Sequence, residues 1–299
     1  MGILVNENCI RLFVKILVLA LISTSLLVCT ADQVMGSGSK PLMAPINPDY
    51  LDFLNLTKNE NNEFQTGFIP PKSRISNPSD GSGMMKSAGD FPASYDLRYF
   101  SRVTSVKDQK SWGTCWAHAA MSSLESNLLP DENWDFSEKN LVNRNLIGTT
   151  PDSGGNHYHS GGYFTAQLGP LSEANDPYPS GTWNYSSPSG PVEKNVYGIH
   201  WLPDKSSPTD LDFIKQSVMD YGALETTYYE NHDWNNTFNS YYCPSANTIN
   251  HAVTIVGWDD NFSRYKFTTA PPGDGALLIK NSWSSDWGDN GYGWISYHD

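Results

Sequence analysis

The 299-residue sequence has few cysteines and few basic residues for its length. Four cysteines are too few for the disulfide scaffolds that hold small secreted domains together. The 19 Lys and Arg residues stand against 32 Asp and Glu residues, a net charge of −13, which argues against nucleic acid or an anionic membrane as a partner. After residue 30 no apolar run is long enough to span a bilayer, and the sequence shows no internal repeat.

Aromatic residues are abundant, at 13% of the chain, and include 10 Trp and 16 Tyr. Together with a hydrophobic content of 38%, they predict a folded protein with a buried core. The length is compatible with about two domains.

The N-terminus has the pattern of a targeting signal. Arg11 and Lys15 precede an uncharged run, and the small residues of Cys29-Thr30-Ala31 favour cleavage before Asp32. Residues 1–31 are therefore predicted to be a secretory signal peptide, and the protein to be secreted or associated with the cell envelope. The alternatives are an uncleaved anchor and a lipoprotein carrying lipid on Cys29.

Removal of residues 1–31 would leave two cysteines, Cys115 and Cys243, and a net charge of −14 from 17 basic and 31 acidic residues. An exported protein reaches an environment in which disulfides persist, so these two cysteines could form a disulfide or remain as thiols.

The composition changes near Phe91-Pro92. Residues 32–90 are rich in Gly, Ser and Pro and predict a linker-like segment, whereas 91–299 predict the folded domain. In that domain we expect a helix from Thr114 or Cys115 to Leu128, ended by Pro130, and a second helical stretch after Ser137. Residues 151–162 are expected to be a glycine-rich loop. The expected strands are 223–229, 252–258, 276–280 and 292–297.

Cys115 is the best candidate for a chemical role. It lies in the first turn of the predicted helix, where the helix dipole and unpaired N–H groups stabilise a thiolate. A thiolate nucleophile needs a basic partner and a group to orient that partner. His251 begins one predicted strand and Asn281 follows another, so both side chains have anchored backbones.

The sequence around these residues resembles the papain family of cysteine peptidases. The resemblance rests on three segments, which are Gln109-Lys110-Ser111-Trp112-Gly113-Thr114-Cys115-Trp116, Asn250-His251-Ala252-Val253, and Asn281-Ser282-Trp283 followed by Trp287-Gly288-Asp289-Asn290-Gly291-Tyr292-Gly293. Weaker matches at 91–98, 136–142 and 160–163 follow the family's order, and the resemblance covers residues 91–298.

The resemblance implies a role for each catalytic residue. Cys115 would be the thiolate nucleophile, and His251 its imidazolium partner and then the acid that protonates the leaving amine. Asn281 would orient the His251 ring, with Trp283 shielding their hydrogen bond from water. The Gln109 side-chain amide and the Cys115 backbone N–H would form the oxyanion hole.

The same resemblance implies a substrate-binding site. Gly161 and Gly162 would pair their backbone with an extended substrate, as in strand addition. Trp287 would flank the leaving-group side. The pocket for the side chain two residues before the cleaved bond would be lined by Tyr163, Thr227 and Ala252.

The implied fold is α+β with two lobes, a helical lobe that carries Cys115 and a β-rich, barrel-like lobe that carries His251 and Asn281, with the active-site cleft between them. Residues 32–90 resemble a propeptide by position, either inhibitory or a simple spacer. The expected activity is hydrolysis of peptide bonds through a Cys acyl-enzyme thioester, with no metal or organic cofactor. The expected partner is a peptide or an unfolded protein.

Some positions depart from the family pattern. Trp112 stands where the family has a cysteine, His159 stands at the expected partner position, and Arg144 replaces a second disulfide cysteine. The chain ends 18 residues after Asn281, where relatives continue, so we expect a shortened C-terminal end.

Two other functions fit parts of the pattern. One is a catalytically inactive peptidase-like domain that binds at the cell surface, and the other is a transglutaminase-like thiol acyl transferase. The pair His157 and His159 could suggest a metal site, but we expect none because no third ligand lies nearby.

Overall fold

The computed structural model describes residues 66–71, 91–188, 190–245 and 248–299. All of them belong to a unit that spans Pro48–Asp299. The signal peptide predicted over residues 1–31, and most of the segment 32–90, lie outside the described residues. Among the described residues, no helix combines the length and apolar character needed to cross a membrane.

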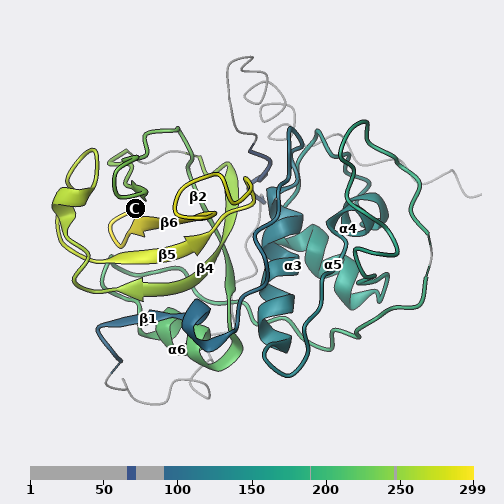
Figure 1. Ribbon diagram of the computed structural model, residues 1–299, viewed down its shortest axis with the longest axis horizontal. Coiled ribbons are helices and arrows are strands. Elements are labelled where there is room, and N and C mark those ends of the chain that lie inside the picture. Colours follow the sequence, from purple (N-terminus) through teal and green to yellow (C-terminus); the bar gives the residue numbers. More distant parts are fainter. Residues whose placement is uncertain (1–65, 72–90, 189, 246–247) are drawn as a thin grey trace, which may run out of the picture. The chain divides into compact units, whose positions relative to one another are not determined.

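One lobe is built on a mixed six-stranded sheet (Figure 1). Its strands are β1 (Ser94–Asp96), β2 (Leu224–Tyr228), β3 (Ser240–Tyr241), β4 (His251–Asp259), β5 (Ala276–Lys280) and β6 (Tyr292–Ser296). The order is β1-β4-β5-β6-β3, with β2 also paired to β4. Only β3 and β6 are parallel among these pairs. The four strands predicted from sequence are confirmed, with ends that differ by at most one residue.

The helices divide between the two lobes. The helical lobe holds α3 (Cys115–Leu128), α4 (Glu138–Arg144) and α5 (His157–Thr165), whereas α6 (Asp212–Tyr221) packs against the sheet (Figure 1). Short 3-10 helices occur at η2 (Leu97–Phe100) and η3 (Arg264–Lys266). The expected helix from Cys115 to Leu128 is confirmed, and Ser137 caps α4 by accepting from the Asn140 N–H. The architecture confirms the α+β class.

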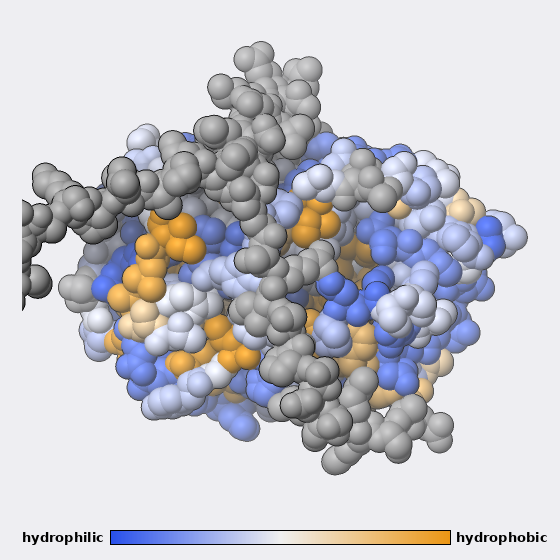
Figure 2. Space-filling view, turned by 180° about the vertical axis from the view of Figure 1, so that it is seen from behind, coloured by the Kyte–Doolittle hydropathy of each residue, from blue (hydrophilic) through white to orange (hydrophobic). Residues whose placement is uncertain are grey.

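Each lobe has its own apolar core. The sheet side is packed around residues such as Trp258, Ile279 and Tyr241, and the helical side around Trp116, Met121 and Phe136. Helix α3 lies against β4 where the lobes meet. On the outer face seen in Figure 2, hydrophobic residues gather in separate patches among hydrophilic ones.

The loop expected over 151–162 is wrong from His157 onward, because α5 begins there. The Asn156 side chain caps this helix by accepting from the Tyr158 N–H. In return, His159 Nδ1 accepts from the Asn156 N–H. The sequence did not predict this helix because it contains two glycines, at 161 and 162, and glycine is a poor helix former.

Candidate active site

Cys115 is the first residue of α3 and is fully buried. Its thiol is within reach of the backbone N–H groups of Trp116, Ala252 and Gly67. Burial nevertheless raises the pKa of Cys115 to about 12, and the Glu225 carboxylate on β2 adds to the rise. The thiol is therefore neutral in this arrangement of the chain.

His251 and Asn281 are brought together by neighbouring strands. His251 opens β4, Asn281 directly follows β5, and the two strands pair with Thr254 opposite Lys280. His251 Nε2 lies 2.9 Å from Asn281 Oδ1, which fixes the plane of the imidazole ring. Burial lowers the pKa of His251 to about 4, so this ring is also neutral here.

Two tryptophans enclose this pair. The Trp283 ring stacks on His251 with centroids 4.5 Å apart and an interplanar angle of 23°. Trp287 meets Trp283 edge-on at 5.4 Å. The Trp283 ring thus covers one face of His251, and Trp287 lies one ring further out.

Gln109 is buried beside the loop that follows Asn281. Its backbone N–H donates to the Ser282 carbonyl at 2.8 Å, and the Ser282 hydroxyl donates to Gln109 Oε1 at 2.6 Å. Its side-chain amide donates to the Trp112 carbonyl at 2.7 Å. The loop that carries Gln109 and the loop that follows Asn281 are thus joined by hydrogen bonds.

Residues 66–71 lie at the junction of the two lobes, drawn in dark blue beside α3 in Figure 1. The Phe68 N–H donates to the Asn250 carbonyl at 2.9 Å. Gly155 receives the Ile69 N–H at 2.8 Å and donates to the Gly67 carbonyl at 2.9 Å, forming a parallel bridge. A peptide segment of this chain is therefore hydrogen-bonded on both sides, directly over Cys115.

The Phe68 side chain fills an apolar pocket next to Cys115. It is completely buried and packs in one cluster with Cys115, Trp116 and Ala252. Its ring centroid lies 5.8 Å from that of His157. Ala252 pairs with Thr227 across the sheet, so these two predicted pocket residues do lie together on this wall.

The glycines that pair with the segment are Gly154 and Gly155, not Gly161 and Gly162. Gly154 has a φ of +71°, and a Cβ there would meet the Gly67 carbonyl oxygen at 2.3 Å. A Cβ on Gly155 would meet the Trp116 ring at 2.5 Å. Gly161 and Gly162 lie inside α5, so their placement against substrate is corrected here.

Tyr163 and His159, two other residues singled out in the sequence, both lie on α5. Tyr163 is fully buried, donates from its hydroxyl to Asn140 Oδ1 at 2.7 Å, and belongs to the same apolar cluster as Phe68 and Ala252. The Gly113 N–H donates to the Pro151 carbonyl at 2.7 Å, and the His159 ring lies 5.5 Å from that of Trp116. No disulfide joins Cys115 to Cys243.

Gly162→Ala provides a direct check of this placement. A Cβ at Gly162 would meet only Leu146, at 3.8 Å, so there is room for alanine. Because alanine favours a helix, the variant should be about 0.5–1 kcal/mol more stable to urea, with unchanged kcat/KM. A large loss of kcat/KM in the folded variant would restore Gly162 to the substrate site.

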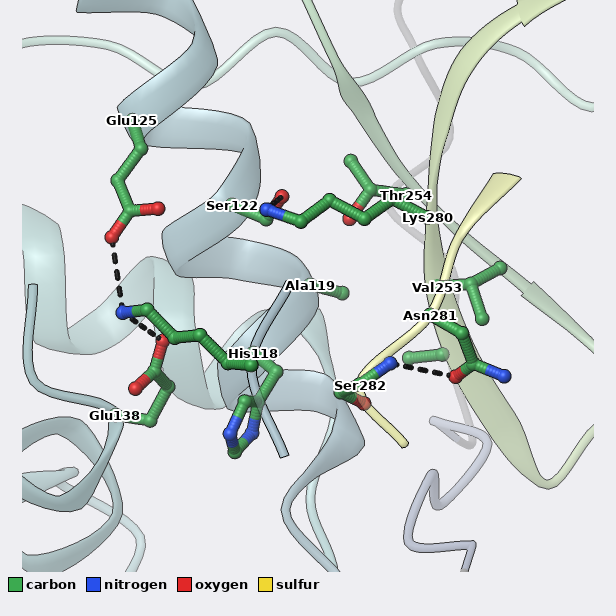
Figure 3. Close-up of a pocket in the computed structure, with 12 residues that line it drawn as sticks. His118, Ala119, Ser122, Glu125, Glu138, Val253, Thr254, Lys280, Asn281 and Ser282 are labelled. Carbon is green, nitrogen blue, oxygen red and sulfur yellow. Dashed lines mark hydrogen bonds and ion pairs between the residues drawn. The ribbon is translucent and has the colours of Figure 1, made fainter. Parts of the chain in front are cut away.

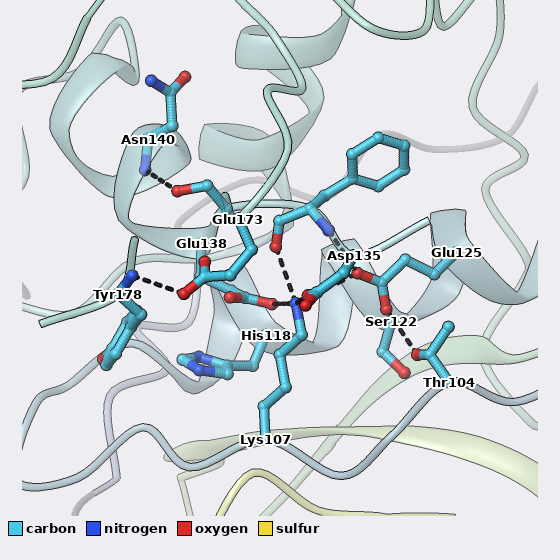
Figure 4. Close-up of polar contacts among 12 residues, drawn as sticks. Thr104, Lys107, His118, Ser122, Glu125, Asp135, Glu138, Asn140, Glu173 and Tyr178 are labelled. Atoms are coloured by element: carbon cyan, nitrogen blue, oxygen red, sulfur yellow. Dashed lines mark hydrogen bonds and ion pairs between the residues drawn. The ribbon is translucent and has the colours of Figure 1, made fainter. Parts of the chain in front are cut away.

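Behind the active site, buried charges tie the two lobes together (Figures 3 and 4). The Lys107 ammonium contacts Glu138 at 2.8 Å and Glu125 at 3.2 Å. From β5, Lys280 donates to Thr104 at 3.0 Å and Ser122 at 3.3 Å, and burial lowers its pKa to about 8. The cavity between them, about 20 Å³, suits about one water molecule.

A family model described as "Papain family cysteine protease" matches residues 91–299. The chain belongs to the papain family. Its predicted fold is confirmed by solved papain-like structures, among them bromelain from Ananas comosus in complex with the E64 inhibitor, at 23% identity and a TM-score of 0.55 over 69% of this chain and 89% of that one.

Several papain-family relatives are more similar in sequence. Digestive cysteine proteinase 2 from Homarus americanus is 30% identical, over 80% of this chain and 71% of the relative. Vignain from Ricinus communis is 26% identical over 71% of this chain. The chain spans 57% of vignain and 40% of a Dictyostelium discoideum protein, gamete and mating-type specific protein A.

A bacterial structure is also similar. The cysteine protease and lectin-like domains of Cwp84, described as a surface layer associated protein of Clostridium difficile, align at 28% identity and a TM-score of 0.59. The alignment covers 86% of this chain and 57% of that structure.

Proposed function

We propose that the chain is an exported cysteine endopeptidase, held latent by the segment that includes residues 66–71. The observation that carries this proposal is the peptide segment hydrogen-bonded to Gly155 and Asn250 directly over Cys115. A cleft that accepts an extended peptide at its nucleophile supports a peptide or an unfolded protein as the substrate class.

In the proposed reaction, the Cys115 sulfur attacks the substrate carbonyl carbon after its proton has passed to His251. The Gln109 amide and the Cys115 backbone N–H stabilise the oxyanion. His251 then protonates the leaving amine, and the C–N bond breaks to leave a thioester on Cys115. Water, deprotonated by His251, releases the acyl group and restores the thiol.

The charge state of the site supports latency. With the segment in place, burial keeps both Cys115 and His251 neutral, although the reaction needs a thiolate and an imidazolium. Release of residues 66–71 would admit water to both groups and lower the free-energy cost of charging them. Export is supported by the predicted signal peptide and by the similarity to Cwp84, a surface layer associated protein.

Labelling with a thiol-directed epoxide tests the proposal. The full chain is cut by limited trypsin treatment within 72–90, which contains Lys72, Arg74 and Lys86, and the trypsin is then blocked with a serine-protease inhibitor. We expect one epoxide per chain on Cys115 and none on Cys243, together with thiol-dependent degradation of casein that the epoxide abolishes.

Two outcomes would contradict the proposal. A cut chain that keeps its folded circular dichroism spectrum, yet neither binds the epoxide nor degrades casein, would favour a binding domain without catalysis. Amine incorporation into casein without chain cleavage would favour a thiol acyl transferase.

A further inference from the structure

The hydroxyl of Tyr178 joins the two ends of the nucleophile loop, residues 109–115. It lies 2.6 Å from Thr114 Oγ1 and donates to the Gln109 carbonyl at 3.0 Å. A phenol has one proton, so the donor to Tyr178 is the Thr114 hydroxyl, and the order of donation runs from Thr114 through Tyr178 to Gln109.

These two ends carry the two groups assigned to the oxyanion hole. Gln109 supplies its side-chain amide, and Thr114 directly precedes Cys115, whose backbone N–H is the second donor. Within the loop, the Gln109 side-chain amide reaches only as far as the Trp112 carbonyl, and contacts from outside hold single points, such as the Gln109 N–H on Ser282 and the Gly113 N–H on Pro151. The Tyr178 hydroxyl spans the loop and so fixes the separation between the two donors.

Tyr178 is itself held from several sides (Figure 4). Its backbone N–H donates to Glu173 Oε1 at 2.6 Å. Its ring meets His118 edge-on at 5.0 Å and Trp183 edge-on at 5.4 Å. Trp183 in turn contacts Trp112 of the same loop at 5.4 Å. Burial raises the pKa of Tyr178 well above its usual range, so the hydroxyl keeps its proton at working pH.

We infer that Tyr178 is a positioning residue for the oxyanion hole, acting through Gln109 and Thr114. The inference rests on the proposed function, because it assigns a purpose to Tyr178 only if Gln109 and Cys115 stabilise an oxyanion. The effect of losing the hydroxyl should appear in the transition state and leave ground-state binding of peptide unchanged.

Tyr178→Phe tests this in the trypsin-cut chain, with Tyr185→Phe as the matched control because Tyr185 is 64% exposed. For Tyr178→Phe we expect kcat to fall about tenfold with little change in KM, from the loss of hydrogen bonds that orient the donors. A peptide aldehyde, whose adduct with Cys115 places its oxygen in the oxyanion hole, should bind about tenfold more weakly.

Binding of the matching peptide with a C-terminal carboxamide in place of the aldehyde should not change, since no tetrahedral oxygen forms. Should Tyr178→Phe fold poorly, Thr114→Val removes the other hydroxyl. Its effect on kcat should be similar in size, and the double variant should be little worse than either single one.

The inference is overturned if an active wild-type chain and Tyr178→Phe share the same kcat and aldehyde affinity. It is also overturned if carboxamide binding weakens as much as aldehyde binding, because that signals general loosening of the cleft. Failure of the proposed function looks different: the wild-type chain itself then lacks epoxide labelling and casein cleavage.

Discussion

Replacing Cys115 with alanine is expected to lower the rate of peptide hydrolysis by roughly 10⁵-fold or more, because the nucleophile forms the acyl bond and the remaining groups act only around it. Cys115 is buried at the start of α3, so removal of one sulfur atom should leave the fold intact. The measurement is casein degradation by the trypsin-cut chain with added thiol, beside circular dichroism of both proteins.

Cys243→Ala is the matched control for this comparison. Cys243 is partly exposed on the sheet side, where its backbone N–H donates to Asp299 at 2.7 Å. Its replacement should leave the rate within twofold of wild type. Thiol-dependent cleavage that survives Cys115→Ala but not Cys243→Ala would show that the nucleophile has been assigned to the wrong cysteine.

Phe68→Ala is expected to raise the activity of the uncut chain about 100-fold. The side chain is fully buried beside Cys115, and truncation of a buried phenylalanine typically costs about 3–5 kcal/mol, which is enough to release a short docked segment for a larger fraction of the time. The measurement is the initial rate on a short fluorogenic peptide, taken before any cleavage of the chain is visible by mass spectrometry.

The control for this variant is Pro71→Ala, at the half-buried end of the same segment. That variant should stay close to the wild-type rate. If Phe68→Ala is no more active than Pro71→Ala and its N-terminal segment remains uncut, the segment does not hold the enzyme latent. Alkylation of Cys115 by iodoacetamide should follow the same order, because a neutral buried thiol reacts slowly.

Much of the site could be predicted from sequence because the signals are local. Thr114 precedes the first residue of α3, and Pro130 follows its end. His251 begins β4 and Asn281 follows β5, and both strands are rich in buried apolar residues. Once those strands pair with Thr254 opposite Lys280, Asn281 comes near His251, and the orientation of the two side chains completes the 2.9 Å contact. The identity of the oxyanion-hole residue Gln109 comes from resemblance, and its catalytic role stays a prediction.

The glycine pair was misplaced because the local signal was ambiguous. Two pairs occur seven residues apart, one followed by Asn156-His157 and the other by Tyr163. What separates them is three-dimensional: only Gly155 lies against the Trp116 ring, where any Cβ would clash. Asn156 was the available clue, since asparagine favours a helix N-cap, and a helix beginning there excludes the second pair from an open loop.

Long-range contacts were beyond the sequence for a different reason. The insertion of Phe68 into the helical core and the contact of Tyr178 with both ends of the nucleophile loop join residues more than forty positions apart. No periodicity or spacing encodes such a contact, and neighbouring residues give no reason to prefer Phe68 over Ile69 as the one that is buried.

Phe68 is part of the apolar core and also part of the segment that we propose is removed on activation. Departure of the segment would leave the helical lobe with a hole the size of a phenylalanine side chain, bordered by Trp116 and Ala252. Unfilled holes destabilise proteins in proportion to their volume, and a ligand that binds only the folded form restores stability by mass action. In such an enzyme, a bound substrate would fill the hole and stabilise the folded state. The enzyme would therefore stay folded for longer when substrate is plentiful than when it runs out.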